Sequence, residues 1–323
     1  MAKAIRIHQN GGPEVLTYED VEIGAPGPGE VHLVQKAVGL NFIDTYHRSG
    51  LYPLPLPFIP GSEGAGDIVA IGKGVKDWKI GDRVAYGTAI GAYASERIID
   101  AQKLVKLPKS ISYEQGAAMM LKGLTVQYLL RQTFKVRPGD TLLVHAAAGG
   151  IGLILCQWAK ALGAIVIGTV SSEEKAKLAK KAGAKHIIFY TREDFAARVK
   201  EITKGKLCDV VYDGVGKTTF VGSLDCLKPR GLMVSFGNAS GPVEGVNLGI
   251  LAQKGSLFVT RPTLGSYADT PDTLRKMAKD LMRVVSSGDV KIPIHSRFAL
   301  ADAAKAHEAL QGRETTGTTV LLP

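Results

Sequence analysis

The spacing of apolar and polar residues changes twice along the chain. From residue 1 to about residue 122, short apolar or alternating runs are separated by glycine and proline, which predicts strands and turns. The expected strands are residues 3–8, 31–40, 66–71, 83–86 and 91–98. Many short strands between turn-rich segments are typical of a compact, partly open β-barrel.

Beyond this region the period becomes helical. Ser112 and Gln115 resemble a capping box at the start of an apolar helical stretch that reaches Phe134. From Asp140, strand and helix patterns alternate. We expect strands at 141–146, 164–170, 186–190, 208–213, 231–236 and 256–260, and helices near 151–162, 172–182, 193–203 and 217–227. Such alternation predicts a parallel sheet with helices on both faces, a doubly wound α/β domain.

The hydrophobic pattern of the last part of the chain again resembles that of the first part. Helices are expected at 271–287 and 301–310, followed by a terminal strand at 318–322. A terminal strand needs a sheet to join, and the N-terminal barrel is the expected host. We therefore predict a discontinuous domain made of residues 1–122 and 264–323, with residues 123–263 forming the α/β domain between them.

The segment from Asp140 to Ser172 carries the clearest chemical motif. A buried strand leads into Ala147-Ala148-Gly149-Gly150-Ile151-Gly152 and then into a helix. Small residues let a pyrophosphate reach the amide groups of a helix N-terminus. Ala147 stands where G-x-G-x-x-G has its first glycine, so a tight turn without a ligand is the alternative. The flanking strand and helix favour a dinucleotide site.

The nicotinamide cofactor is selected at the end of the second strand of this unit. An NAD site has Asp or Glu there to bind the ribose 2′-hydroxyl. This chain instead has Ser171 and Ser172, followed by Lys175, and Tyr190 ends the next strand. These residues favour NADPH, whose 2′-phosphate needs room and a cation. A solvated helix lysine and a strand-end aromatic residue are the alternatives for Lys175 and Tyr190.

Composition limits the class of protein. The 323 residues are 45% hydrophobic and 22% charged, as in ordinary soluble domains. We find no 18-residue apolar window and no N-terminal leader, so we expect no membrane association and a cytoplasmic location. Three scattered cysteines suit buried thiols better than disulfides or a zinc cluster.

The formal net charge of +10 raises the question of nucleic acid. The basic residues are spread over the sequence, and the densest run, 175–185, has the pattern of a solvated helix face. We expect at most weak, salt-sensitive RNA binding and no RNA-recognition role as the primary function.

The order of motifs resembles that of the medium-chain dehydrogenases/reductases, and more closely the bacterial NADPH:quinone oxidoreductases related to zeta-crystallin. The matching segments are 11–16, 41–46, 48–53, 61–66, 121–125, 145–152, 231–238 and 259–262, in the family's order and over nearly the whole chain. The alanine-first glycine turn also matches this family. The resemblance implies a GroES-like β-barrel catalytic domain joined to a Rossmann domain, and a homodimer that pairs through the edge strand of the Rossmann domain, within residues 246–262.

The resemblance also implies a set of cofactor contacts. These expected residues are Phe42, Tyr46, Lys122, Thr125, Tyr128, Gly149, Gly150, Ile151, Gly152, Ser171, Ser172, Lys175, Tyr190, Val215, Phe236, Gly237, Asn238 and Arg261. The glycine turn, the two serines, Lys175 and Tyr190 follow from the residues alone as well.

Zinc-dependent relatives carry a cysteine ligand and a Gly-His-Glu motif where this chain has Asn41 and Gly61-Ser62-Glu63. Catalytic zinc usually takes three protein ligands, and a single glutamate is a poor site. His47 and His145 do not stand at ligand spacing. We therefore predict that no metal is bound.

Without a metal, reduction of an acceptor that is already electrophilic remains feasible. The cofactor supplies hydride, and the protein must align the acceptor and stabilise the growing oxyanion. We expect the amide of Asn41 and the hydroxyls of Tyr46 and Tyr52 as donors, with Asp44 orienting Asn41 or accepting from the cofactor ribose. An asparagine turn and aromatic packing are the alternatives. The predicted activity is NADPH-dependent quinone reduction, with 2-alkenal or enone reduction, or a nucleic-acid-binding or crystallin-like structural role, as alternatives.

Overall fold

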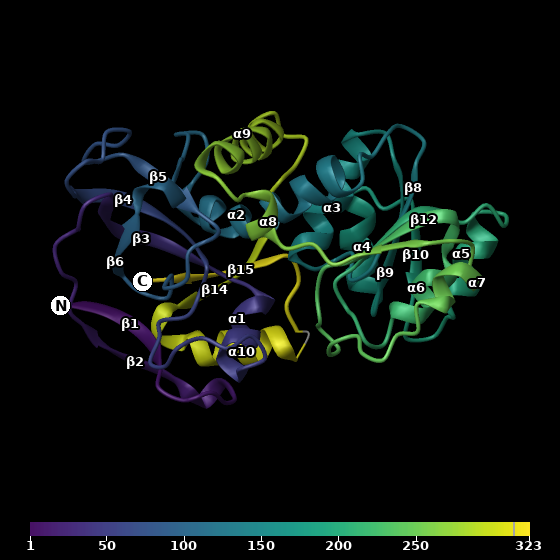
Figure 1. Cartoon of the computed structure of the whole chain (residues 1–323), viewed down its shortest axis with the longest axis horizontal. Helices are drawn as coiled ribbons and strands as arrows, with labels where there is room; N and C mark the ends of the chain where they lie inside the picture. Colours follow the sequence, from purple (N-terminus) through teal and green to yellow (C-terminus); the bar gives the residue numbers. More distant parts are fainter. Residues whose placement is uncertain (313) are drawn as a thin grey trace. The chain divides into compact units, whose positions relative to one another are not determined.

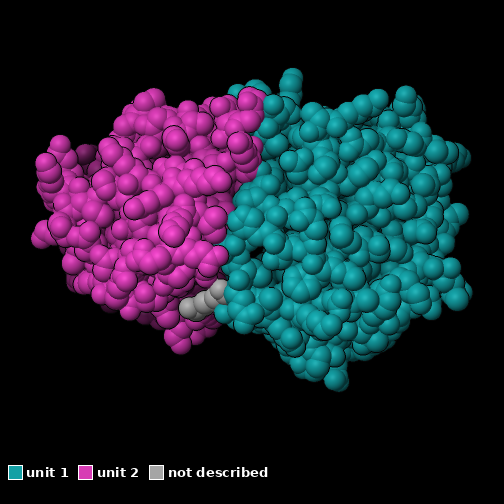
Figure 2. Space-filling view, turned by 180° about the vertical axis from the view of Figure 1, so that it is seen from behind, with its two compact units in different colours: residues 1–124, 268–286, 292–323 teal, residues 125–267, 287–291 magenta. Residues whose placement is uncertain are grey.

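The computed structural model describes residues 1–312 and 314–323 and divides into two compact units. The first contains residues 1–124, 268–286 and 292–323, and the second contains residues 125–267 and 287–291. Figure 2 shows them in two colours. The sequence analysis placed the domain boundaries after residues 122 and 263. In the structure the boundaries between the units lie after residues 124 and 267, and the second unit also includes residues 287–291.

The second unit contains a six-stranded sheet with the strand order β10-β9-β8-β11-β12-β13. Figure 1 labels β8, β9, β10 and β12 of this sheet. Every neighbouring pair in this sheet is parallel. Numbered along the unit, this is the order 3-2-1-4-5-6 of the Rossmann fold. The strands are β8 Thr141–Val144, β9 Ile165–Val170, β10 His186–Phe189, β11 Cys208–Asp213, β12 Leu227–Ser235 and β13 Phe258–Thr260.

Helices connect the first five strands in the order that the sequence predicts. They are α3 Gly150–Ala161, α4 Glu173–Lys181, α5 Phe195–Ile202 and α6 Phe220–Asp225. The short helix α7 Gly249–Gln253 lies between β12 and β13, and α8 Leu264–Tyr267 follows β13. Helix α3 packs beside α4, and α5 packs beside α6. Parallel strands with right-handed crossovers place such helix pairs on the two faces of the sheet. The predicted doubly wound domain is confirmed.

Several strand limits differ from the prediction, and the changes at β8 and β12 accompany unusual backbone angles. β8 ends at Val144 instead of residue 146, because Ala146 has a positive φ of 51° and already belongs to the turn. β12 begins at Leu227 instead of residue 231, although Pro229 and Arg230 lie inside it. Arg230 also has a positive φ, and the register between β11 and β12 shifts at this point.

The first unit contains a seven-stranded mixed sheet and a two-stranded hairpin. The main path is β14-β15-β3-β4-β5-β7, and β6 pairs with β3. The elements are β1 Ala2–Ile7, β2 Leu16–Val21, β3 Glu30–Leu40, α1 Phe42–Ser49, β4 Glu63–Ile71, β5 Arg83–Tyr86, β6 Glu96–Asp100, β7 Val105–Lys106, α2 Tyr113–Tyr128, α9 Pro271–Ser286, β14 Ile294–Ala299, α10 Ala303–Gln311 and β15 Thr318–Leu322. The sequence analysis did not predict β2, β7 and β14.

The terminal strand joins the N-terminal sheet, as predicted. β15 pairs antiparallel with β3 through Thr319 and Leu40, and parallel with β14 on its other side. The core of this unit accordingly contains Ile5, Leu33 and Ile68 from early strands together with Leu321 from the end of the chain.

The described residues contain no helix long and apolar enough to cross a membrane. Cys156, Cys208 and Cys226 are free and buried, in agreement with the expectation of buried thiols. Burial raises the pKa of Cys156 and of Cys208 to about 12, so these thiols are poor nucleophiles at neutral pH.

Candidate functional site

The turn between β8 and α3 is shaped for close approach of an anion. Gly149 precedes the first turn of α3, and no side chain caps that end of the helix. The first amide groups of a helix have no partner within it, so those of Gly150, Ile151 and Gly152 are available. A Cβ on Gly152 would lie 2.4 Å from the carbonyl oxygen of Ala146. Glycine is therefore required where the helix passes the turn, and the geometry fits a pyrophosphate.

The end of β9 has the small polar residues that NADPH selection needs. Ser171 and Ser172 follow the strand directly, and the Ser172 hydroxyl accepts from the backbone N–H of Lys175 at 3.3 Å. This hydroxyl thus caps α4 and places Lys175 in its first turn. The first acid after the strand, Glu173, is exposed and paired with Arg192 at 2.7 Å.

Tyr190 lies at the same edge of the sheet as these serines. Its backbone N–H donates to the carbonyl oxygen of Val170 at 3.2 Å, one residue before Ser171. The side chain is 40% exposed. A partly exposed aromatic residue directly after β10, the strand that pairs with β9, fits a phosphorylated nucleoside. Asp or Glu is absent from residues 168–172 at the end of β9.

Two further loops of the second unit contain expected cofactor contacts. The buried carboxylate of Asp213 accepts from the backbone N–H groups of Val215 and Gly216, which fixes the loop after β11. Arg261 donates to the carbonyl oxygens of Ser235 and Gly237 at 3.0 and 2.9 Å. Arg261 therefore holds the loop after β12, which carries Phe236, Gly237 and Asn238.

Tyr128 and Thr125 lie in the part of α2 that belongs to the second unit. The Tyr128 ring stacks on that of Tyr267, with centroids 4.4 Å apart and planes 9° from parallel. Burial raises the pKa of Tyr128, so its hydroxyl stays protonated. Sequence reasoning missed Tyr267, because no local pattern links residues so far apart in the chain.

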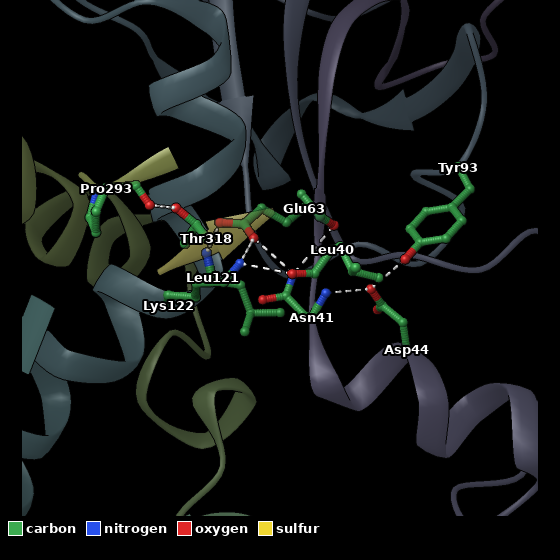
Figure 3. A network of polar contacts seen from close by, with 10 residues as sticks. Leu40, Asn41, Asp44, Glu63, Tyr93, Leu121, Lys122, Pro293 and Thr318 are labelled. Carbon is green, nitrogen blue, oxygen red and sulfur yellow. Dashed lines mark hydrogen bonds and ion pairs between the residues drawn. The ribbon is translucent and has the colours of Figure 1, made fainter. Parts of the chain in front are cut away.

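In the first unit, Asn41 stands between β3 and α1 and is held from both sides (Figure 3). Its backbone N–H donates to Oδ2 of Asp44 at 2.9 Å, as a residue before a helix does in a capping box. Its side-chain Nδ2 donates to Oε2 of Glu63 at 2.8 Å, with a longer contact of 3.4 Å to the carbonyl oxygen of Gly39. Asp44 thus orients the backbone of Asn41, whereas Glu63 orients its amide.

Glu63 is the first residue of β4 and is completely buried. Lys122 donates to its Oε2 at 3.1 Å and to the carbonyl oxygen of Leu40 at 3.0 Å. The backbone N–H of Leu121 donates to Oε1 at 2.8 Å. A buried carboxylate with an ammonium partner and two further donors is fully satisfied. Sequence reasoning considered Glu63 only as a metal ligand, and missed its role as the partner of Lys122 and Asn41.

Within residues 1–312 and 314–323, no three His, Cys, Asp or Glu side chains are grouped to hold a metal ion. The ammonium of Lys122 supplies the positive charge beside Glu63. His47 and His145 are both buried, and burial lowers the pKa of each ring. His145 bonds Thr169 and Ser223, so it is part of the sheet-to-helix packing of the second unit.

Asp44 is also completely buried, and its environment is unlike that of Glu63. Burial raises its pKa to about 7, although the Asn41 backbone, the Tyr93 hydroxyl and Lys122 act in the opposite direction. Oδ2 accepts from the Tyr93 hydroxyl at 2.9 Å. Oδ1 has no hydrogen-bond partner among the described residues. Asp44 is therefore a carboxyl group near half ionisation at neutral pH.

Helix α1 gathers the expected aromatic residues. The ring of Tyr46 lies 5.7 Å from that of Phe42 and 5.2 Å from that of Tyr52, centroid to centroid. The backbone N–H of Tyr52 donates to the carbonyl oxygen of Tyr46 at 3.1 Å, which fixes the loop after the helix. The structure thus brings Asn41, Asp44, Tyr46 and Tyr52 to one end of β3 and the helix that follows it.

The family models that match this chain agree with these two units. A GroES-like domain of alcohol dehydrogenases matches residues 27–109, and the zinc-binding dehydrogenase model matches residues 150–280. The chain is 62% identical to a quinone oxidoreductase of Pseudomonas aeruginosa over the full length of both. It is 47% identical to a 2-haloacrylate reductase of a Burkholderia species, covering 100% of this chain and 99% of that protein.

A solved structure gives the same result. The Escherichia coli quinone oxidoreductase in complex with NADPH is 53% identical, with a TM-score of 0.98, and the match covers 99% of this chain and all of that one. The fold is therefore a Rossmann domain with a GroES-like barrel domain. The chain belongs to the quinone oxidoreductase family of the medium-chain dehydrogenases/reductases.

Proposed function

We propose that this chain is an NADPH-dependent quinone reductase. The observation that carries this proposal is the full-length match, at 62% identity, to a protein named quinone oxidoreductase. The 53% identical structure that holds NADPH supports the choice of cofactor. The amide-lined turn at Gly149 and the absence of an acid at the end of β9 fit the same cofactor.

The residues that would hold NADPH fall into three groups. The amides of Gly150, Ile151 and Gly152 would bind the pyrophosphate, with Gly149 leaving the approach open. Ser171, Ser172, Lys175 and Tyr190 would bind the adenosine phosphate. The remaining proposed contacts are Phe42, Tyr46, Lys122, Thr125, Tyr128, Val215, Phe236, Gly237, Asn238 and Arg261.

NADPH, when bound, supplies the hydride. The chain's own residues would orient the quinone and stabilise the charge that develops on its oxygen. The hydroxyls of Tyr46 and Tyr52 are donors for that oxygen. Asn41 can add its second amide hydrogen, because the present acceptor, the carbonyl oxygen of Gly39, is as far as 3.4 Å away. The rings of Phe42, Tyr46 and Tyr52 would exclude water.

A second candidate is reduction of a carbon–carbon double bond conjugated to a carbonyl group. The relative named 2-haloacrylate reductase, 47% identical over the whole chain, favours it. Both reactions need hydride delivery and a donor for an oxyanion, so the same residues serve either. We place quinones first because the more similar relatives carry that name.

The test is an acceptor panel with the purified protein. NADPH oxidation should be fast with para- and ortho-quinones and slow with 2-alkenals and 2-haloacrylate, and NADPH should be preferred to NADH. Faster turnover with the alkenes would replace the first function by the second. No NADPH oxidation with any acceptor would reject both.

We also propose that the chain forms a homodimer through β13, the edge strand of the Rossmann sheet. Phe258 is 60% exposed and Val259 38%, and Leu248 in the preceding segment is 75% exposed. Exposed apolar residues on a sheet edge favour pairing with a second copy. Light scattering should give a dimer, and Phe258→Asp should give a monomer. A monomeric wild-type protein would reject the proposal.

We further propose a cytoplasmic location, which fits the family. RNA binding, as the second class of activity, would be weak and salt-sensitive at a net charge of +10. A gel shift that NADPH competes would support it.

A further inference from the structure

A chain of hydrogen bonds runs through the first unit to Asp44 from the far end of α1. Arg48, the next-to-last residue of that helix, contacts Nδ1 of His307 through Nη1 at 3.0 Å. Nε2 of His307, on α10, contacts the Tyr93 hydroxyl at 3.0 Å. The Tyr93 hydroxyl donates to Oδ2 of Asp44 at 2.9 Å (Figure 3). All four side chains are buried, so no solvent competes for these bonds.

Arg48, the first residue of this chain of hydrogen bonds, fixes the direction in which each hydrogen bond is donated. A guanidinium has only donors, so Nδ1 of His307 must accept from Arg48. The ring proton of neutral His307 is then on Nε2 and is donated to the oxygen of Tyr93. That leaves the Tyr93 hydrogen for Asp44. Burial, and then the nearby charge of Arg48, lowers the pKa of His307 to about 3, so the ring keeps this tautomer throughout the working pH range.

The same logic locates the proton of Asp44. Oδ2 already accepts from the Tyr93 hydroxyl and from the backbone N–H of Asn41. Oδ1 is buried and has no partner among the described residues. When the carboxyl group is neutral, its hydrogen is therefore on Oδ1. The chain of hydrogen bonds thus determines that Oδ2 of Asp44 accepts from the Asn41 backbone before α1 and that Oδ1 carries the proton.

We propose that Arg48, His307 and Tyr93 are positioning residues for the reduction, acting through Asp44 on Asn41 and on helix α1, which carries Tyr46. This inference rests on the proposed function. The same guanidinium group of Arg48 also donates through Nε to the carbonyl oxygen of Gly11 at 3.2 Å and through Nη2 to Oε1 of Gln311 at 2.8 Å. The orientation of Asn41 therefore depends on α10, which the sequence separates from it by more than two hundred residues.

The variants are chosen to remove one bond each. Tyr93→Phe removes the hydroxyl and keeps the ring. His307→Leu removes both nitrogens, whereas His307→Gln keeps one acceptor and one donor. Tyr86→Phe is the matched control, since Tyr86 is a completely buried tyrosine of the same unit whose hydroxyl bonds Gln35 and Arg97 and not Asp44.

We expect Tyr93→Phe and His307→Leu to lower kcat with quinone about 10-fold, with the KM for NADPH within about twofold, because a misplaced donor affects the chemical step. His307→Gln should recover to within about threefold of wild type, and Tyr86→Phe should match wild type. Losses below twofold in the first two variants, a glutamine variant as slow as the leucine variant, or a rise in the KM for NADPH alone would overturn the proposal.

A pH profile separates positioning from a general loss of packing. The groups that face Asp44 are Tyr93, Lys122 and Glu63, and the Tyr93 hydroxyl lowers the pKa of Asp44. Loss of the Tyr93 hydroxyl should therefore raise the pKa of Asp44. If Asp44 positions the turn, kcat should change with pH as Asp44 ionises, and this step should move to higher pH in Tyr93→Phe and disappear in Asp44→Asn. A pH profile of kcat that is the same in wild type and both variants would overturn the proposal. If the wild-type protein does not oxidise NADPH in the presence of any quinone, the proposed function itself fails. That result is obtained before any variant is made.

Discussion

The two halves of the molecule, the Rossmann unit and the barrel unit, carry their proposed contacts in different ways. In the Rossmann unit, the expected cofactor contacts are backbone amides and small or half-exposed side chains at the ends of strands, such as Gly150, Ser172 and Tyr190. In the barrel unit, Asn41, Asp44, Glu63 and Lys122 are buried and bonded to one another. The Rossmann unit presents its polar groups at the ends of strands, where a charged ligand can reach them. The barrel unit contains a satisfied polar network whose geometry depends on residues distant in the sequence.

The largest effect should come from breaking the buried half. Glu63→Ala leaves the ammonium of Lys122 buried without its partner, which should lower the free energy of unfolding by about 3–5 kcal/mol. Chemical denaturation followed by circular dichroism measures this change. Asp77→Ala, which breaks the exposed pair with Arg275, is the control and should cost about 0–1 kcal/mol. Equal losses would remove the distinction between the two kinds of site.

Glu63→Leu combined with Lys122→Met refines the same point. This double variant removes both charges, so it should be more stable than Glu63→Ala. Its activity should still be low, because Asn41 loses the acceptor that orients its amide. Full activity in the double variant would show that the buried pair serves stability alone.

A change of charge after β9 in the Rossmann unit should alter the preference for NADPH over NADH without unfolding the protein. Lys175→Glu should weaken NADPH binding about 100-fold and NADH binding by no more than about threefold, since a bond to a charged group contributes about 1.5–3 kcal/mol. Fluorescence titration with both cofactors measures the two affinities. Lys177→Glu, on an exposed position of the same helix, is the control. Equal losses for both cofactors would reject the proposed phosphate pocket.

A smaller effect is expected at Asn41, the proposed oxyanion donor of the barrel unit. Asn41→Ala should lower kcat with quinone about 10-fold, because one preset donor is lost, while NADPH affinity stays within about threefold. Steady-state kinetics and cofactor titration separate the two quantities. Unchanged turnover would remove Asn41 from the mechanism.

The stability of the wild type should show the smallest net signal, because two buried groups give it opposite pH dependences. The raised pKa of Asp44, about 7, makes its contribution fall as pH rises from about 4 to about 7. The lowered pKa of His307, about 3, makes its contribution rise with pH up to about 6.5. The two slopes, each at most about 1.4 kcal/mol per pH unit, offset one another in the wild type.

Single variants should therefore expose one slope each. Relative to wild type, Asp44→Asn should gain stability as pH rises from about 4 to about 7, and His307→Gln should lose it over the same range. Denaturation at a series of pH values tests both signs. Parallel curves for the three proteins would mean that neither group changes its pKa on folding.

The contrast between the halves also explains what the sequence could predict. The strand–turn–helix at residues 140–172 is local, and hydrophobic period, glycine spacing and the serines after the strand are visible within a short window. The doubly wound sheet and the return of residues 318–322 to the barrel follow from the same kind of pattern. Ala146 shows the limit, because its positive φ ends β8 earlier than hydrophobicity alone suggests.

The buried network could not be predicted in the same way. Asn41 was singled out because it stands where zinc-dependent relatives have a cysteine ligand, but its partner Glu63 comes from β4. Its partner Asp44 is linked through Tyr93 and His307 to a loop and to α10. Such contacts depend on which strands are neighbours in the folded barrel. The strands missed by pattern, β2, β7 and β14, are short or largely polar on one side, and tertiary pairing stabilises them.

The placement of β15 bears on how the protein is made. This strand lies between β3 and β14, so the barrel sheet lacks an interior strand until residues 318–322 have been synthesised. The Rossmann sheet, by contrast, is complete by Thr260. On the ribosome, the nucleotide-binding half can fold before the barrel sheet is complete. During that interval residues 38–40 of β3 lack the partner strand β15, and this edge must be kept from pairing with other chains.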